Sequence, residues 1–125
     1  MSDIETEALL EANEAFYRAM RAGDLAAMSA LWSRTRRVSC THPDGPSLFG
    51  REAVLESWRV IFARPNGIPI QPAEPSAVVT GTTAMVLCRE ELSDLQLMAS
   101  NVFVREGTGW RMVNHQAAPI PREQG

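Results

Sequence analysis

Apolar residues recur at helical spacing in the first half of the chain. The first stripe consists of Ile4, Leu9, Ala12, Phe16, Ala19 and Met20. Its period of about 3.6 residues predicts an amphipathic helix, and Gly23 followed by Asp24 predicts its end and the N-cap of a second helix over 25–32. A further stripe in 51–63 predicts a third helix and consists of Val54, Leu55, Trp58, Ile61 and Phe62.

The apolar period changes from 3.6 to two elsewhere, which predicts strands. Residues 37–42 alternate, and Pro43 ends that strand. The segment 68–81 contains three prolines, so we expect an irregular or edge strand there. The remaining predicted strands are 82–92, 95–106 and 110–118. This order predicts one α+β domain over 1–125, with three helices on a curved, mostly antiparallel sheet, and a loose tail over 119–125.

Charge and composition exclude several classes of function. The 125 residues carry a net charge of −3, so no basic field attracts a phosphate backbone, and we expect no nucleic-acid partner. No apolar run approaches the roughly 20 residues that a membrane span needs. The acidic first residues differ from an export signal, so we expect a cytoplasmic protein in which Cys40 and Cys88 stay reduced.

The stretch CTHPDG carries the most distinctive chemistry. Cys40 and His42 stand two residues apart, which places both side chains on one face of a strand. Two cysteines and two histidines could supply four metal ligands. Their spread over positions 40, 42, 88 and 115 lacks the close pairs of a zinc site, so we expect neither metal nor cofactor. Cys40 is then a small buried wall residue, and His42 is either a functional imidazole or a cap of the following turn.

Four stretches resemble the nuclear transport factor two-like superfamily in its SnoaL-like branch. They are FYRAMRAGDLAAMSALW, VSCTHPDGPSLFGREAVLESWRVIF, AMVLCREEL and NVFVREGTGWRMVNHQAAP, within residues 4–119. The resemblance implies a cone-shaped, cystatin-like fold. It does not imply one activity, because this fold hosts isomerases, cyclases, dehydratases and plain binding or assembly modules.

Ketosteroid isomerase, a relative within that superfamily, gives a sharper comparison. The resemblance puts Phe16 where that enzyme has a tyrosine, His42–Pro43 where it has an Asp-Pro pair, and Asn101 where it has a second acid. Phe16 cannot donate to an oxyanion, which disfavours steroid isomerisation. His42 remains a candidate general base, and Asn101 remains a candidate hydrogen-bond donor.

The related pattern also predicts which face of the last strand lines the pocket. It places Asn114 and Gln116 inward as pocket amides, or alternatively as partners in cross-strand hydrogen bonds, and it places His115 on the outer face. The expected ligand-binding residues are Phe16, Cys40, Trp58, Asn101, Asn114 and Gln116.

Three functions remain open on these grounds. The first is a binding protein whose pocket takes a mostly apolar small molecule with a few polar groups. The second is an isomerase, cyclase or hydratase that uses His42 as general acid or base. The third is an assembly module without catalysis. In each case we expect a homodimer through the outer sheet face, formed by Met85, Leu87, Met98, Val102, Val104 and Val113.

Overall fold

The computed structural model describes residues 3–65 and 67–121. In the first half of that range lie α1 (Asp3–Ala22), α2 (Leu25–Leu31), β1 (Ser39–Thr41), β2 (Ser47–Phe49) and α3 (Arg51–Phe62). In the second half lie β3 (Gln71–Thr80), β4 (Thr83–Glu91), β5 (Gln96–Glu106) and β6 (Gly109–Pro119). The predicted α+β order is confirmed. The short strand β2 lies in a segment for which the sequence pattern predicts a loop.

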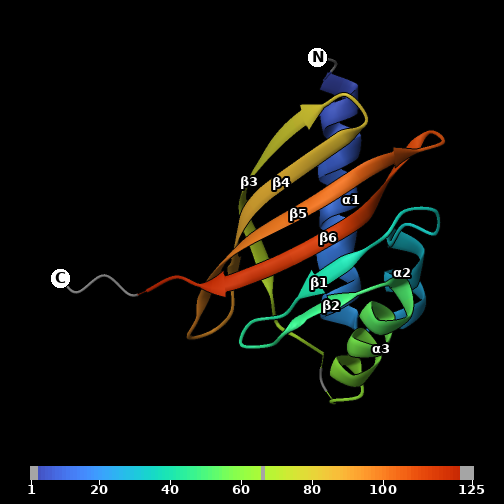
Figure 1. Cartoon of the computed structure of the whole chain (residues 1–125). Helices are drawn as coiled ribbons and strands as arrows, with labels where there is room; N and C mark the ends of the chain where they lie inside the picture. Colours follow the sequence, from blue (N-terminus) through green and yellow to red (C-terminus); the bar gives the residue numbers. More distant parts are fainter. Residues whose placement is uncertain (1–2, 66, 122–125) are drawn as a thin grey trace.

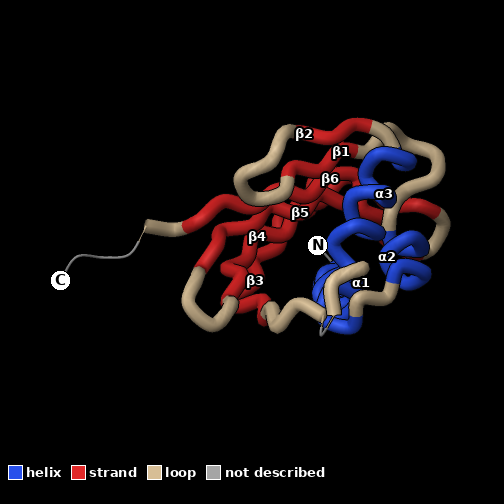
Figure 2. The backbone as a smooth tube through the Cα atoms, turned by 90° about the horizontal axis from the view of Figure 1, so that it is seen from below, coloured by secondary structure: helices blue, strands red, loops and turns tan. Residues whose placement is uncertain are grey.

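The strands form one sheet in the order β2-β1-β6-β5-β4-β3. Only the β1–β6 pair is parallel among the described pairs. The three helices lie on one face of the sheet, with α1 running along it, and no described helix covers the other face (Figures 1 and 2). The architecture is therefore the predicted one, a curved sheet wrapped around helices.

Local sequence signals explain the element ends. Gly23 has the left-handed φ of 62°, and Asp24 accepts a hydrogen bond from the backbone of Ala27 at 3.0 Å, as an N-cap does. The proline-rich strand β3 lies at an edge of the sheet and is interrupted by an irregularity between Ala73 and Ser76. Both predictions are confirmed.

A β-bulge divides strand β6. Val102 pairs with Asn114 and Phe103 pairs with Met112, so Val113 is an extra residue without a partner in the register. Because side chains alternate along a strand, one extra residue reverses the faces beyond it. Met112 points inward on one side of the bulge, and His115 points inward on the other.

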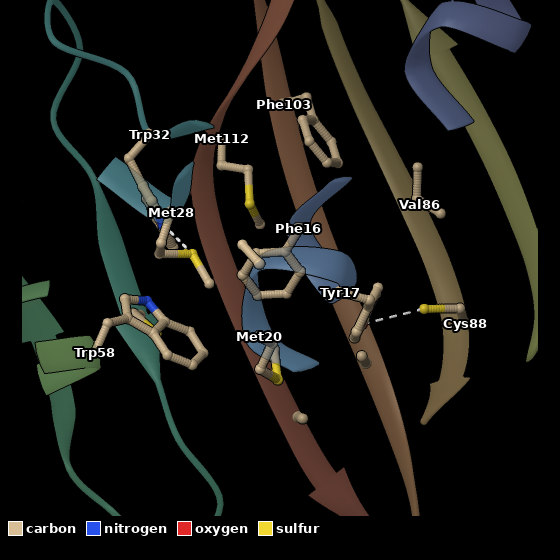
Figure 3. Close-up of a cluster of buried hydrophobic side chains, with 14 of the residues drawn as sticks. Phe16, Tyr17, Met20, Met28, Trp32, Trp58, Val86, Cys88, Phe103 and Met112 are labelled. Atoms are coloured by element: carbon tan, nitrogen blue, oxygen red, sulfur yellow. Dashed lines mark hydrogen bonds between the residues drawn. The ribbon is translucent and has the colours of Figure 1, made fainter. Parts of the chain in front are cut away.

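Phe16 lies at the centre of the core between the helices and the sheet (Figure 3). Its ring packs edge-on against Tyr17 and Trp58, at centroid distances of 5.0 and 5.7 Å. It also contacts the ring of His115 in a tilted arrangement at 4.9 Å. The core thus brings one face of α1 against both α3 and the inner face of β6.

Arg51 fastens α3 against the end of α2. Its guanidinium donates to the carbonyl oxygens of Trp32 and Ser29, each at 2.8 Å. The carbonyl group of Ser29 lies in the last turn of α2, and that of Trp32 follows the helix, so neither has a hydrogen-bond partner within the helix. One arginine supplies the missing donor to both. The contact holds the first residue of α3 against the last turn of α2.

Strand β6 and its hydrogen bonds extend further toward the C-terminus than predicted. Pro119 still pairs with Leu97, and the backbone N–H of Ile120 donates to Gln96 at 2.9 Å. The predicted loose tail is therefore wrong for 119 and 120, and its residues 122–125 lie outside the described range. No helix in the described ranges is both long and apolar enough to cross a membrane.

Candidate functional site

A cavity of about 250 Å³ opens between the end of β1, helix α3 and the inner face of the sheet. Its wall is mostly apolar, with Met20, Ile61, Ile68, Ile70 and Leu97 among its members. The titratable side chains that line it are His42, Glu90 and His115. The polar groups of these lining side chains are two imidazoles, one carboxyl group and the indole of Trp58, whose buried N–H has no hydrogen-bond partner among the described residues.

His42 is held at the cavity by the turn that follows it. Its carbonyl oxygen accepts a hydrogen bond from Gly45 at 3.0 Å, and Asp44 adopts a left-handed φ of 63° to close that turn. The imidazole packs edge-on against Trp58 at 4.7 Å between centroids. The backbone of His42 therefore closes the turn, and its side chain lines the cavity.

Ser57 fixes the orientation of the His42 ring. The serine hydroxyl donates to the carbonyl oxygen of Val54 at 2.6 Å, and its oxygen lies 2.9 Å from Nε2 of His42. Since the only hydroxyl proton is already donated, Nε2 must carry the proton of that second bond. Burial lowers the pKa of His42, so the ring is neutral and Nδ1 is left with a lone pair.

Cys40 lies behind this imidazole. Its sulfur is 3.7 Å from Nε2 of His42, and the side chain is fully buried. Burial, and then the charge of Glu90, raise the pKa of the thiol to about 12. Cys40 is thus a protonated wall group at neutral pH and not an activated nucleophile.

Four buried polar side chains form a network behind the cavity. The amide nitrogen of Asn101 donates to Asn13 Oδ1 at 2.9 Å and to the Tyr17 hydroxyl at 3.1 Å. The amide oxygen of Asn101 lies 2.6 Å from Nδ1 of His115. Asn101 therefore faces inward as predicted, but both of its amide hydrogens are used within the protein. In this arrangement neither donor is directed at the cavity, and the catalytic role of Asn101 stays a prediction.

Tyr17 links this network to Glu90. Its hydroxyl donates to a carboxyl oxygen of Glu90 at 2.6 Å and lies 3.3 Å from the sulfur of Cys88 (Figure 3). Burial raises the pKa of Glu90 and, together with the nearby carboxyl group, that of Tyr17. Burial thus favours the protonated form of Glu90 relative to an exposed glutamate, and the hydrogen bond from Tyr17 acts in the opposite direction.

His115 is the clearest departure from the sequence prediction. It is 2% exposed, and burial, followed by the nearby His42, lowers its pKa to about 3. The prediction that His115 faces outward is wrong, because the extra residue Val113 reverses the faces of β6. For the same reason Asn114 and Gln116 do not line the cavity. Asn114 donates to Ser39 Oγ at 2.8 Å as a cross-strand partner, and Gln116 is exposed.

The predicted site residues therefore separate into three groups. His42 and Trp58 line the cavity. Phe16, Cys40 and Asn101 are fully buried one layer behind it. Asn114 and Gln116 lie on the opposite face. Among the described residues no group of three or more histidine, cysteine or acidic side chains is placed to hold a metal ion.

Sequence reasoning missed Tyr17, Ser57, Glu90 and His115. A signal existed for Glu90, because Ala84, Val86, Cys88 and Glu90 alternate along one strand and the first three are buried. Tyr17 lies about 100° from Phe16 around the helix, so the single apolar stripe of the sequence does not include it. Both side chains are buried nonetheless, since α1 packs against the sheet over more than one stripe.

Comparison with known proteins is consistent with this architecture. The sequence matches the SnoaL-like domain over residues 9–122. A candidate dehydratase from the NTF2-like family of Streptomyces avermitilis is 35% identical, with a TM-score of 0.88 over 96% of this chain and 99% of that chain. A candidate calcium/calmodulin-dependent protein kinase type II association domain from Thiobacillus denitrificans is 32% identical. Its TM-score is 0.74 over 88% of this chain and 93% of that chain.

A curated relative is longer. The F-box protein SKIP8 of Arabidopsis thaliana is 27% identical over 115 residues, which are 90% of this chain and 50% of that protein. The chain thus spans about half the length of the curated relative that it matches. With a cystatin-like fold and a match that covers nearly all of its length, the chain belongs to the SnoaL-like domain family.

Proposed function

We propose that this protein binds a small, mostly apolar molecule in the cavity between His42 and Glu90. The proposal rests on one observation, which is that several titratable side chains line the same cavity. His42, Glu90 and His115 line one cavity of about 250 Å³ whose wall is otherwise mostly apolar. Ligand sites typically combine an apolar wall with a few convergent polar groups and perturbed pKa values.

The volume limits the size of the ligand. At roughly 30 Å³ per water molecule, the cavity has room for about eight waters. Drug-sized ligands occupy pockets of roughly 300–1,000 Å³, so this one suits a smaller molecule.

The binding proposal is tested by filling the cavity. Ile61 lines it, whereas Val60, the preceding residue on α3, is 56% exposed. A library of small neutral compounds is screened by ligand-observed NMR, and each hit is then titrated into Ile61→Trp and the matched control Val60→Trp. We expect Ile61→Trp to abolish binding and Val60→Trp to preserve it. Equal affinity in both variants would place the ligand elsewhere and overturn the proposal.

The second candidate function is an enzyme that uses His42 as general acid or base. The unprotonated Nδ1 of His42 favours it, since a neutral imidazole beside a cavity can accept a proton from a bound substrate. The similarity to a candidate dehydratase supports the same reading. Small alcohols and enolisable ketones are assayed for dehydration or isomerisation by absorbance. A His42→Ala variant that retains full activity on a substrate found in this way would exclude His42 as the base.

We also propose that the uncovered sheet face pairs two copies of the chain. Leu87 and Met98 are 39% and 49% exposed on that face. Val104 is buried and Val113 is the bulge residue packed against the core, so neither belongs to the exposed part of the expected interface. The molar mass of Met98→Lys in solution is measured by light scattering and compared with that of Ile4→Lys, which changes an exposed residue of α1. A monomeric wild-type protein at tens of micromolar would exclude the dimer.

A further inference from the structure

The two imidazoles at the cavity are held in opposite tautomers. Nε2 of His42 carries its proton toward Ser57, because the Ser57 hydroxyl already donates to the carbonyl oxygen of Val54. Nδ1 of His115 carries its proton toward Asn101, because the Asn101 oxygen can only accept. The nitrogens left with lone pairs are therefore Nδ1 of His42 and Nε2 of His115.

Neither lone pair has a partner among the described residues. No hydrogen bond to Nδ1 of His42 or to Nε2 of His115 is formed by a described side chain or backbone group. Both rings line the same cavity, and both contact Trp58, with centroid distances of 4.7 Å for His42 and 6.1 Å for His115. The cavity wall thus presents two neutral acceptors close to one aromatic ring.

The rest of the wall bears no cation to pair with a charged ligand. No arginine lines the cavity, and the chain contains no lysine. Protonating either imidazole would create a positive charge in a site that is shielded from water. Burial therefore lowers the pKa of both rings and opposes protonation. The only acid is Glu90, which accepts a hydrogen bond from Tyr17.

We propose that the ligand of this cavity is an uncharged molecule that carries a hydroxyl group, an alcohol or phenol, which donates its proton to His42 Nδ1 or His115 Nε2. A hydroxyl supplies the donor that both imidazoles lack, and an apolar frame fills the space between Met20, Ile61 and Leu97. Because the ligand class presupposes that the cavity binds a small molecule, it rests on the proposed function. A carboxylate would bring an uncompensated charge into the site, and an ether would leave both lone pairs unpaired.

Three bicyclic probes separate these possibilities by calorimetric titration. They are 2-naphthol, 2-methoxynaphthalene and 2-naphthoate, which share one apolar frame and differ in donor and charge. We expect 2-naphthol to bind about fivefold more tightly than the ether, in line with one hydrogen bond, and the carboxylate to bind most weakly. An ether or carboxylate that binds as tightly as the phenol would overturn the ligand class and leave the proposed function standing. Absence of binding by all three would overturn both.

The tautomers are tested without any ligand. Long-range ¹H–¹⁵N NMR of the uniformly labelled protein distinguishes protonated from unprotonated ring nitrogens. We expect unprotonated signals for Nδ1 of His42 and Nε2 of His115 at pH 7. The reverse tautomer at either ring would overturn the inference.

Ser57→Ala then tests the positioning role of the serine. Removing the hydroxyl releases the His42 ring, so we expect a mixture of tautomers and a loss of about fivefold in 2-naphthol affinity. Ser100→Ala, on the opposite face of the sheet, serves as the matched control and should change neither. An unchanged His42 tautomer in Ser57→Ala would show that the serine does not position the ring.

Discussion

The hydroxyl of Tyr17 on α1 lies 2.6 Å from a carboxyl oxygen of Glu90 on β4, and both side chains are buried. This hydrogen bond joins the first helix to the strand that carries the only acid at the cavity. It also satisfies a carboxyl group in a place where an unpaired one would be costly. The same contact therefore contributes to the stability of the fold and to the protonation equilibrium of Glu90, where it opposes the rise in pKa that burial causes.

Tyr17→Phe should destabilise the protein by roughly 1–3 kcal/mol, because it leaves the carboxyl group of Glu90 without its partner. Urea denaturation at pH 7 measures the effect. The double variant Tyr17→Phe/Glu90→Leu, together with the two single variants, completes a thermodynamic cycle in which leucine removes the acceptor, and we expect a coupling energy of about 0.5–3 kcal/mol. Strict additivity of the two substitutions would show that the hydrogen bond contributes nothing.

Glu90→Gln should stabilise the protein above the ordinary pKa of a glutamate. Burial raises the pKa of Glu90 in the folded state, so the folded protein holds a proton that the unfolded chain releases. The contribution of this carboxyl group to the free energy of unfolding is fully present below about pH 4.5, and it is lost as the pH rises through the pKa of the folded state. Urea denaturation between pH 4 and pH 8 should show a growing advantage of the variant, and parallel profiles would contradict the shift.

Acid should destabilise the protein through His115. Its pKa is lowered from the ordinary 6.5 to about 3 in the folded state. Between these two pH values the unfolded chain binds a proton that the folded protein does not bind. Stability is therefore complete above about pH 6.5 and is lost as pH falls toward 3, by up to about 1.4 kcal/mol per pH unit. His42, whose pKa is also lowered, adds to the same loss.

His115→Gln isolates the contribution of that ring. Glutamine can still donate to Asn101 but does not titrate, so its stability profile between pH 6.5 and pH 4 should be flatter than that of the wild type. His42→Gln serves as the comparison. A wild-type slope retained in both variants would assign the acid sensitivity to other groups.

Gly67→Ala should destabilise the protein far more than Gly81→Ala. Both glycines have left-handed φ values, 59° and 61°, so each substitution carries a backbone cost of about 1 kcal/mol. Only at Gly67 would the added methyl group overlap the carbonyl oxygen of Arg21, whereas nothing lies within 4 Å at Gly81. Thermal denaturation of the two variants compares them, and equal losses would show that the segment shifts without resistance.

The helices and most strands could be predicted because their signals are local. The stripe around Phe16, the Gly23–Asp24 boundary and the prolines of β3 act over a few residues, and the structure confirms each. His42 could be placed for a similar reason, since a strand end followed by proline is a local pattern. These features need no knowledge of distant partners.

The inner layer of the site could not be predicted in the same way. The bulge at Val113 arises from pairing with β5 and leaves no mark within β6 itself, so strict alternation assigned Asn114 and His115 to the wrong faces. The role of Tyr17 depends on Glu90, which lies 73 residues away. Register and long-range hydrogen bonds are properties of the assembled sheet, and a single sequence does not display them.

The extra residue in β6 also has an evolutionary consequence. Residues 114–118 hold two interleaved sets of side chains, His115 and Ala117 inward, and Asn114 and Gln116 outward. Loss of the codon for Val113 would remove the bulge but leave Asn114 opposite Val102 and His115 opposite Asn101, so both sets would keep their faces. A domain of this shape can therefore gain or lose one residue at this point of β6 while the lining of its cavity stays the same, which makes the bulge a place where descendants tolerate a change in length.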